Sequence, residues 1–434
     1  KKNKNLVKRT SNLRHERLSH PNDWRSTIAI TCSCAAILVV AVWTVRTTSH
    51  EKRKPSSKNE TTSRNKPDVN SEVKSNAEGT EEENEEGTRE SEKSNEERAC
   101  DDTINELPDP NWEKVGEIQE LYMYPLKSGR GRSLRECDFT NWGISCGDPG
   151  KFKLRDRMFL VYNEETGRFQ TGRQYPTLIL VSLSAVDETK VKLEAVGMPS
   201  VIFQVPRNPE NASEAVQCTM WWGEPVKCID CGTESAEWLS RFLTGTTSGL
   251  RLGYTMMDKR NVFVEPWKKF TKVYQTLRNE DTGLFSDLAS YMLMTTRSME
   301  QLNEKLERPV PALQFRPNIL VSTQQPFEED QWEWIKIGER VVIRNVKPCT
   351  RCKLVGLNPE NGVMDKEEPL KTLKSFRQQA DPERISLEGK APMMGIYCGL
   401  YVPGSVKIGD EVFVHRSSGS PVELNHREEE AKPR

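Results

Sequence analysis

Short apolar runs separated by turn residues dominate this chain from about residue 112 onward, and this pattern limits it to a strand-rich fold. Residues 115–124 are typical of a strand that Pro125 would end, because proline cannot donate a hydrogen bond to a strand ladder. Residues 163–167 have the composition of a turn. Further predicted strands in this part cover residues 157–162, 177–182, 191–195 and 200–205. Short strands joined by frequent turns are typical of a small barrel.

Two helices are predicted among the strands. Apolar residues within 236–243 recur at helical spacing. The stretch Ser298-Met-Glu-Gln301 resembles a capping box and predicts a second helix that stops before Pro309. The remaining predicted strands cover residues 318–322, 340–346, 395–402 and 411–415. We therefore predict a strand-dominated α+β chain with two domains that meet at the polar stretch 244–249.

The first 110 residues differ in composition from the rest. Residues 1–25 are polar and basic. Residues 26–45 contain no charge, and this stretch has the length that a helix needs to cross a bilayer. Trp24 and Trp43 stand where interfacial aromatic residues belong. A signal peptide is the alternative, but the apolar run is longer than usual and no small-x-small cleavage site closes it. Residues 46–110 are polar and acidic, and they predict a disordered linker.

Charge and cysteine content narrow the classes of function. The formal net charge is −1 and no stripe of basic and aromatic residues appears, so nucleic acid is not a predicted partner. The 11 cysteines are an odd number without a framework pattern, which argues for reduced thiols in a chain of 434 residues. No dinucleotide fingerprint of the G-x-G-x-x-G kind is present. The first residue is Lys1, so we expect the natural chain to begin upstream.

One cysteine pair follows a predicted strand, in Pro348-Cys349-Thr350-Arg351-Cys352. A thiolate is a soft metal ligand, and an adjacent guanidinium stabilises thiolate and can bind phosphate with two hydrogen bonds. This combination suits an anionic cofactor that carries a metal. Taken alone, the pair could also be buried apolar packing, half of a zinc site with Cys228 and Cys231, or a redox pair. The zinc spacing exceeds that of ordinary zinc ribbons, and no helical pattern follows Cys352 as a redox pair requires.

Six motifs, in order, connect the chain with a known family. They are Tyr124-Pro-Leu-Lys-Ser128, Leu154-Arg-Asp-Arg157, Thr171-Gly-Arg-Gln174, Phe315-Arg-Pro-Asn318, Pro348-Cys-Thr-Arg-Cys352 and Glu368-Pro-Leu-Lys-Thr-Leu-Lys-Ser-Phe-Arg377. With these motifs the chain from about residue 112 to 415 resembles MOSC-domain proteins, in particular the mitochondrial amidoxime reducing component family. Composition and resemblance together give the expected organisation: a basic segment at 1–25, a transmembrane helix at 26–45, an acidic linker at 46–110, a MOSC N-terminal β-barrel domain at 111–245, a MOSC β-barrel domain at 246–416 and a flexible tail at 417–434.

The resemblance also implies a molybdenum cofactor, in which molybdopterin carries the metal. In the family the second cysteine of the motif binds molybdenum, which assigns that role to Cys352 and leaves Cys349 to packing or to support of the site. The positions that match residues around the cofactor are Lys127, Ser128, Arg157, Arg316, Asn318, Thr350 and Arg351. Arg173 is a further candidate, with a structural role as its alternative. Asp287 would either assist proton delivery near the metal or cap a turn.

The chain departs from the family pattern after Asp287. Relatives tend to have two small hydroxyl residues and then Pro at this point, whereas Leu288, Ala289 and Ser290 follow here. Hydroxyl contacts from positions 288 and 289 to the cofactor would therefore be lost. This departure bears on cofactor affinity or on the range of substrates.

The resemblance implies a membrane-anchored oxidoreductase that reduces N-hydroxylated compounds such as amidoximes and hydroxylamines, with electrons from NADH through cytochrome b5 reductase and cytochrome b5. Two alternatives stay open: a sulfur carrier of the cofactor sulfurase type with a persulfide on Cys352, and a molybdopterin-binding protein without turnover. The resemblance implies the mitochondrial outer membrane, and the endoplasmic reticulum is the alternative. The supply of cofactor and the free cysteines favour a catalytic part in the cytosol. The basic residues before the span instead favour a cytosolic N-terminus.

Overall fold

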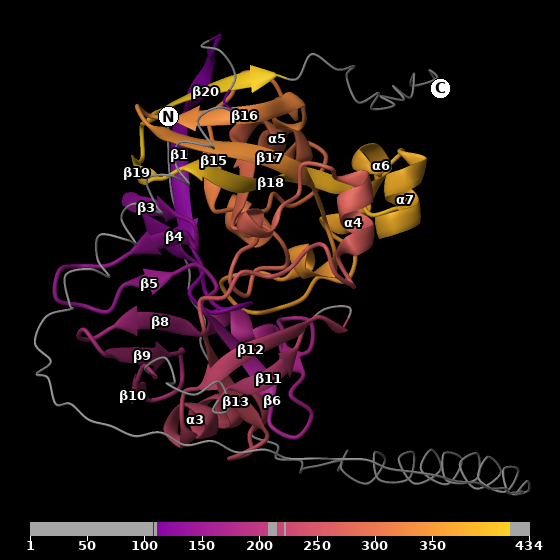
Figure 1. Cartoon of the computed structure of the whole chain (residues 1–434). Coiled ribbons are helices and arrows are strands. Elements are labelled where there is room, and N and C mark those ends of the chain that lie inside the picture. Colours follow the sequence, from indigo (N-terminus) through magenta and orange to yellow (C-terminus); the bar gives the residue numbers. More distant parts are fainter. Residues whose placement is uncertain (1–106, 108–110, 207–214, 221–222, 417–434) are drawn as a thin grey trace, which may run out of the picture. The chain divides into compact units, whose positions relative to one another are not determined.

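Figure 1 shows the computed structural model of the chain, which describes residues 107, 111–206, 215–220 and 223–416. The predicted basic segment, membrane helix and C-terminal tail lie outside the described residues, as does the predicted linker apart from Leu107. Within the described ranges, no helix is both long enough and apolar enough to cross a membrane.

Strands make up most of the regular structure. They are β1 (Glu113–Met123), β2 (Arg132–Leu134), β3 (Glu136–Thr140), β4 (Gly143–Cys146), β5 (Leu154–Arg155), β6 (Phe159–Asn163), β7 (Phe169–Gln170), β8 (Ser182–Ala185), β9 (Lys190–Glu194), β10 (Val201–Gln204), β11 (Val216–Thr219), β12 (Pro225–Asp230), β13 (Leu250–Thr255), β14 (Tyr291–Thr295), β15 (Ile319–Val321), β16 (Trp332–Ile337), β17 (Val341–Thr350), β18 (Met393–Val402), β19 (Gly404–Lys407) and β20 (Glu411–Arg416).

The helices are short. The α-helices are α3 (Thr233–Thr244), α4 (Lys268–Val273), α5 (Thr296–Asn303), α6 (Leu370–Arg377) and α7 (Pro382–Glu388). The 3-10 helices are η1 (Pro176–Leu180), η4 (Asn279–Asp281), η5 (Ala312–Phe315), η6 (Glu328–Gln331) and η7 (Lys353–Gly356).

Seven strands close into a barrel in the order β15-β14-β18-β17-β16-β20-β1, and a further pairing between β1 and β15 completes the ring. Strand β1 makes this closure because its two halves pair with different neighbours. Residues 113–117 pair antiparallel with β20, whereas residues 118–121 pair antiparallel with β15. Buried apolar residues of these strands, such as Ile335 and Ile343, form one core. Closure leaves the barrel without a free strand edge.

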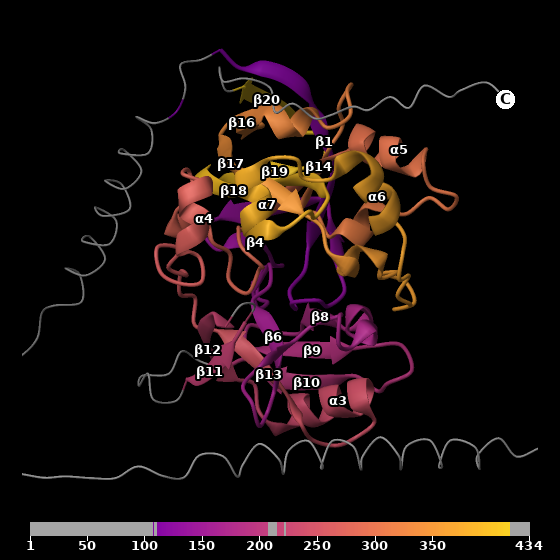
Figure 2. The same cartoon turned by 90° about the vertical axis from the view of Figure 1, so that its right-hand side faces the viewer.

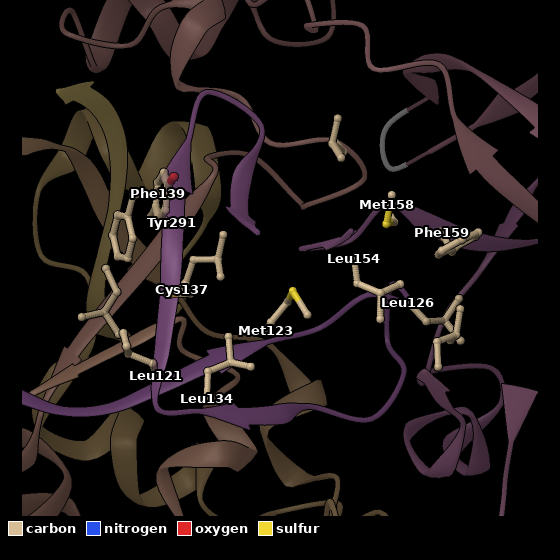
Figure 3. Close-up of a cluster of buried hydrophobic side chains, with 14 of the residues drawn as sticks. Leu121, Met123, Leu126, Leu134, Cys137, Phe139, Leu154, Met158, Phe159 and Tyr291 are labelled. Carbon is tan, nitrogen blue, oxygen red and sulfur yellow. The ribbon is translucent and has the colours of Figure 1, made fainter. Parts of the chain in front are cut away.

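The core continues along the end of β1 (Figure 3). Leu121 and Met123 of β1 and the following Leu126 are all almost completely buried, and they belong to the same cluster as Phe139 of β3 and Tyr291 of β14. The rings of Phe139 and Tyr291 stack with their centroids 4.7 Å apart. This packing fixes the direction in which the chain leaves β1 and enters the loop after it.

Strand β2 extends the large sheet by pairing antiparallel with β1. The remaining strands form three smaller sheets, with the orders β11-β12-β13-β6-β7, β10-β9-β8 and β19-β3-β4-β5. Helix α3 contacts β13 and β10, which confirms the helix predicted within 236–243. Two of the sheets join strands from both sides of residue 245, since β13 lies between β12 and β6 and β19 pairs with β3. The predicted boundary therefore divides the sequence but not the sheets. The predicted fold class, strand-dominated α+β with a barrel, is confirmed.

Two local predictions are wrong. Residues 177–182 were predicted as one strand, but most of them form η1, in which Pro176 occupies the first helical position that its fixed φ suits. Leu178 and Ile179 are buried in this helix, so their apolar character reflects burial and not strand pairing. Helix α5 begins earlier than the predicted capping box, because Thr295 is the N-cap and accepts a hydrogen bond from the amide of Ser298.

Replacing Gly116 with Ala should weaken the closure of the barrel. A Cβ atom at this position would lie 1.7 Å from the main-chain oxygen of Ser322, next to the pairing of β1 and β15. The two strands would have to separate, so we expect the free energy of unfolding to fall by about 1–3 kcal/mol in urea titrations.

The control for this variant is Lys114→Ala on the same strand, where an exposed ion pair with Glu411 is removed. That substitution should cost less than about 1 kcal/mol. Equal losses in the two variants would contradict the assignment of the close approach at Gly116 as the feature that holds the closure.

Candidate functional site

The sequence motifs meet at one open cavity with an empty volume of about 820 Å³. The structure brings together every predicted site residue on its wall: Lys127, Ser128, Arg157, Asp287, Arg316, Asn318, Thr350, Arg351 and Cys352. The first four come from the loops after β1, after β5 and before β14. The others come from the segment before β15 and from the end of β17 and the residues that follow it.

Cys352 stands where β17 has ended and η7 begins, as the N-cap residue of that helix. Its thiol is partly exposed in the cavity wall. The guanidinium of Arg173 donates to it, with 3.0 Å between Nη2 and Sγ. Arg173 was the weaker candidate in the sequence, and the structure places it in contact with the predicted metal ligand. The contact holds the sulfur of Cys352 in a fixed orientation on the cavity wall.

Cys349 differs from Cys352 in its surroundings. It is buried in a cluster with methionine residues of β14 and β18, among them Met292 and Met394. This position agrees with the predicted packing role. The zinc interpretation would need Cys228 and Cys231 to share a metal with Cys349 and Cys352. Within the described residues, no three His, Cys, Asp or Glu side chains lie together as a metal site. Cys228 instead lies 3.2 Å from Cys218, sulfur to sulfur.

Arg351 lines the cavity but directs its nitrogens into the protein. Nε and Nη2 donate to the carbonyl of Met394 at 2.8 and 2.6 Å. Nη1 donates to the carbonyl of Phe315 at 2.9 Å. These bonds join the end of β17 to β18 and η5. The geometry therefore favours a structural role for Arg351, in which it fixes the loop that carries Cys352, over the predicted phosphate contact.

Asn318 has a similar anchoring role. Its side-chain amide donates to the carbonyl of Tyr122 at 3.2 Å and to Asp156 at 3.1 Å. Its side-chain oxygen accepts from the amide of Met292 at 3.2 Å and from Arg157 at 3.3 Å. These contacts hold β1 and β14 at the start of β15. Asn318 thus orients the cavity wall in addition to lining it.

Two arginines form a cationic wall around one aromatic ring. The guanidinium carbons of Arg157 and Arg316 lie 4.6 and 4.2 Å from the ring centroid of Tyr124. Asp156 forms an ion pair with Arg157. Both arginines have a left-handed backbone, with φ of 50° and 58°. Ser128 on the same cavity has φ of 63°. Non-glycine residues in this region are uncommon and often occur at ligand sites.

Arg316 has an unused donor in the described part of the chain. Its Nη1 donates to the carbonyl of Gly129 at 2.8 Å, whereas its buried Nη2 has no hydrogen-bond partner there. Burial lowers the pKa of Arg316 to about 10, so the group remains charged at neutral pH. A buried donor without an acceptor is costly. An anion in the cavity would remove this cost, and phosphate matches the guanidinium best.

Lys127 and Asp287 form an ion pair that connects the loop after β1 with the loop before β14. Nζ of Lys127 donates to Asp287 at 2.6 Å and to the carbonyl of Phe285 at 2.7 Å. Burial lowers the pKa of Lys127. Burial alone would raise the pKa of Asp287, but Lys127, Arg173 and Arg157 outweigh it and lower the pKa to about 2. Asp287 is therefore ionised at neutral pH, which fits a counter-ion better than the predicted proton donor.

Several wall residues were missed by sequence reasoning. They are Thr171, Ser286, Met292, Gln314, Phe315, Leu354, Val355 and Tyr397. Thr171 and Phe315 stand inside the quoted motifs, so the motifs themselves could have indicated them. Ala289, where the chain departs from the family pattern, also lies on the wall. Tyr397 belongs to β18, far along the chain, and the pairing of β18 with β14 and β17 brings it to the site.

Comparison with known proteins agrees with the fold and the site. Residues 115–246 match the model of the MOSC N-terminal beta barrel domain, and residues 280–413 match that of the MOSC domain. The chain is thus a MOSC-domain protein that carries the associated N-terminal barrel domain.

Its relatives narrow this class further. Mitochondrial amidoxime-reducing component 1 of Mus musculus is 36% identical over 305 residues, which cover 70% of this chain and 83% of the relative. Component 1 of Homo sapiens is 34% identical, with coverage of 70% and 84%. Component 2 of Bos taurus is 34% identical over 301 residues, with coverage of 69% and 84%. The chain belongs to the mitochondrial amidoxime-reducing component family.

Replacing Asp287 with Asn should destabilise the protein at neutral pH and have less effect in acid. The substitution leaves the buried ammonium of Lys127 with one fewer acceptor. Because the Asp287 side chain is 47% exposed, solvent screens the pair, and we expect a loss of about 1–3 kcal/mol at pH 7. The pKa of Asp287 is lowered to about 2 by folding, so its contribution is present above the ordinary value near 4 and disappears as the pH falls toward 2.

Denaturant titrations at pH 7 and near pH 2.5 measure this difference. The matched control is Asp138→Asn, whose carboxylate is 43% exposed and pairs with an exposed lysine, Lys153. It should change the free energy of unfolding by less than about 1 kcal/mol. A difference between wild type and Asp287→Asn that is equal at both pH values would contradict the assignment of Asp287 as an ionised partner of Lys127.

Proposed function

We propose that this chain is a molybdenum-cofactor enzyme that reduces N-hydroxylated compounds such as amidoximes and hydroxylamines. The observation that carries the proposal is the position of Cys352, a thiol in contact with Arg173 on the wall of a cation-rich cavity. The relatives are named for amidoxime reduction. In the reaction an amidoxime takes up two electrons and two protons, its N–O bond breaks, and an amidine and water are formed.

The residues of the cavity fit an anionic cofactor that carries a metal. The thiolate of Cys352 is a soft ligand of the kind that molybdenum accepts. The unpartnered Nη2 of Arg316 and the nearby Arg157 suit the phosphate of molybdopterin. Ser128 can add a hydroxyl from the loop after β1. When bound, the cofactor supplies a metal centre that can accept an oxygen atom while two electrons pass to the substrate.

The protein's own groups divide the remaining tasks. Arg173 would orient the Cys352 sulfur, and Arg351 would fix the loop that presents it. Thr350 lines the cavity, but its hydroxyl donates to Glu388 at 2.9 Å. It therefore offers the cofactor a lone pair and not its proton. Asp287 would balance Lys127 and the arginines, so the two protons of the reaction come from solvent or from another group.

The electron donors and the location are part of the same proposal. Cytochrome b5 and its NADH-dependent reductase would supply the electrons, in agreement with the absence of a dinucleotide fingerprint in the sequence. The uncharged stretch at 26–45 would anchor the enzyme in a membrane. We propose the outer mitochondrial membrane with the catalytic part in the cytosol, because the cofactor and the reduced cysteines suit that compartment. The endoplasmic reticulum is the alternative location.

Replacing Cys352 with Ser should remove the activity. The full chain is produced in a host that makes molybdenum cofactor, and bound molybdenum and amidoxime turnover with cytochrome b5, its reductase and NADH are measured. We expect near-stoichiometric metal in the wild type and a loss of turnover of at least about 100-fold in the variant, because even supporting residues of metal sites contribute up to that factor.

Cys146→Ser is the matched control, since Cys146 is also partly exposed but lies outside the cavity. It should keep metal and turnover. Molybdenum without turnover in the wild type would replace the proposal by a cofactor-binding protein. A persulfide on Cys352 without molybdenum would make the chain a sulfur carrier.

A further inference from the structure

A second cavity, with an empty volume of about 900 Å³, adjoins the first at Cys352. Six residues line both cavities: Arg173, Asp287, Thr350, Arg351, Cys352 and Tyr397. Cys352 is therefore part of the wall that the two cavities share. One of them holds most of the cations described above, whereas the other has a different chemical character.

The wall of the second cavity away from Cys352 is mainly apolar. Trp267 and Phe270 come from the start of α4, and their rings lie at 5.0 Å between centroids. Leu288, Leu387 and Ala391 complete this wall. Helices α4 and α7, which carry most of these residues, lie side by side in Figures 1 and 2. Trp267, Phe270 and Leu288 are almost completely buried, whereas Leu387 and Ala391 are partly exposed. An aromatic or branched apolar group would bury its surface against these two residues.

The polar groups at the far end of this cavity are already paired. Glu388 accepts hydrogen bonds from Nζ of Lys347 and from the hydroxyl of Thr350, both at 2.9 Å, and from the hydroxyl of Tyr274. The Lys347 and Glu388 side chains are almost completely buried. Lys347 and Glu388 neutralise each other within this network. Neither of these two side chains is therefore available as an unpaired charge for a ligand at that end of the cavity.

We propose that the second cavity binds the organic substituent of the substrate, and that it selects N-hydroxylated compounds with an aromatic or branched apolar group. This inference rests on the proposed function, because the first cavity is assigned there to the cofactor. With an anion in the first cavity, the second is the space that still reaches Cys352. The substrate's N–O group would lie at the shared wall, and its substituent would contact the partly exposed Leu387 and Ala391.

The charged groups of the shared wall are already paired, which leaves apolar contact as the basis of selection. Asp287 accepts a hydrogen bond from Lys127, and Arg351 donates to main-chain carbonyls. Arg173 donates to the sulfur of Cys352.

The test narrows the cavity with Leu387→Phe and compares it with Ile385→Phe. Both positions are partly buried aliphatic residues of the same helix α7, but only Leu387 lines the cavity. Binding of benzamidoxime to the metal-loaded full chain is measured by calorimetry without an electron donor, so that no turnover occurs. Molybdenum content is measured on the same samples, and steady-state kinetics follow with the electron donors present.

We expect Leu387→Phe to weaken benzamidoxime binding by about tenfold and to raise KM with little change in kcat, because one misplaced group in an apolar pocket has effects of that size. The smaller acetamidoxime should be affected less, and Ile385→Phe should bind both compounds as the wild type does. Molybdenum content should be the same in all samples. Ala391→Leu, which narrows the same cavity from another position, should weaken benzamidoxime binding as well.

The assignment of this cavity would be overturned if Leu387→Phe and Ile385→Phe had equal effects on benzamidoxime binding. It would also be overturned if neither Leu387→Phe nor Ala391→Leu changed this binding. Failure of the wild type to bind benzamidoxime would overturn it too, even if other N-hydroxylated compounds are reduced. Binding that depends on Leu387 without any turnover would uphold the cavity and overturn the proposed function. The two proposals therefore fail in different ways.

Discussion

The pairing of β1 with two different strands is the constraint on which the rest of the structure depends. Its first half completes a ladder with β20 and its second half a ladder with β15, so one strand from the beginning of the described chain closes a barrel whose other members all come after residue 290. The packing of Leu121, Met123 and Leu126 then directs the chain into the loop with Lys127 and Ser128. Strand β1 therefore belongs to the barrel and leads directly into a loop of the cavity wall. A shift in the register of β1 would move both the barrel closure and this loop.

The cavity wall brings together several buried cations, which would be costly to bury without partners. Arg157 and Arg316 pack on the ring of Tyr124, and Arg157 also forms an ion pair with Asp156. Lys127 forms an ion pair with Asp287. These partners offset part of the desolvation of each charge, but the buried Nη2 of Arg316 remains without an acceptor among the described residues. The arrangement is therefore incomplete as a purely structural network, and it becomes complete when an anion is present. This incompleteness is the physical argument that links the fold to cofactor chemistry.

Much of the site could be predicted from the sequence because its residues stand in short motifs, and all nine predicted positions line one cavity. What the motifs could not show is how each side chain is used. The sequence places Arg351 beside Cys352, but only the return of β18 shows that its nitrogens bond to main-chain carbonyls. Likewise, the composition around residue 115 predicts a strand, but not that this strand joins the barrel of the later domain, because such pairing depends on contacts about 200 residues apart. The strand prediction at 177–182 failed because a buried apolar run has no period of its own.

The left-handed backbone at Ser128, Arg157 and Arg316 has a consequence for the evolution of this protein. Glycine would adopt these angles without strain, and each of the three positions instead carries a side chain that lines the cavity. Selection for stability alone would replace all three. Their retention would keep the apo-protein below the stability that its barrel could reach, and sequence libraries screened only for thermal resistance should accumulate glycine or asparagine there while they lose the ligand.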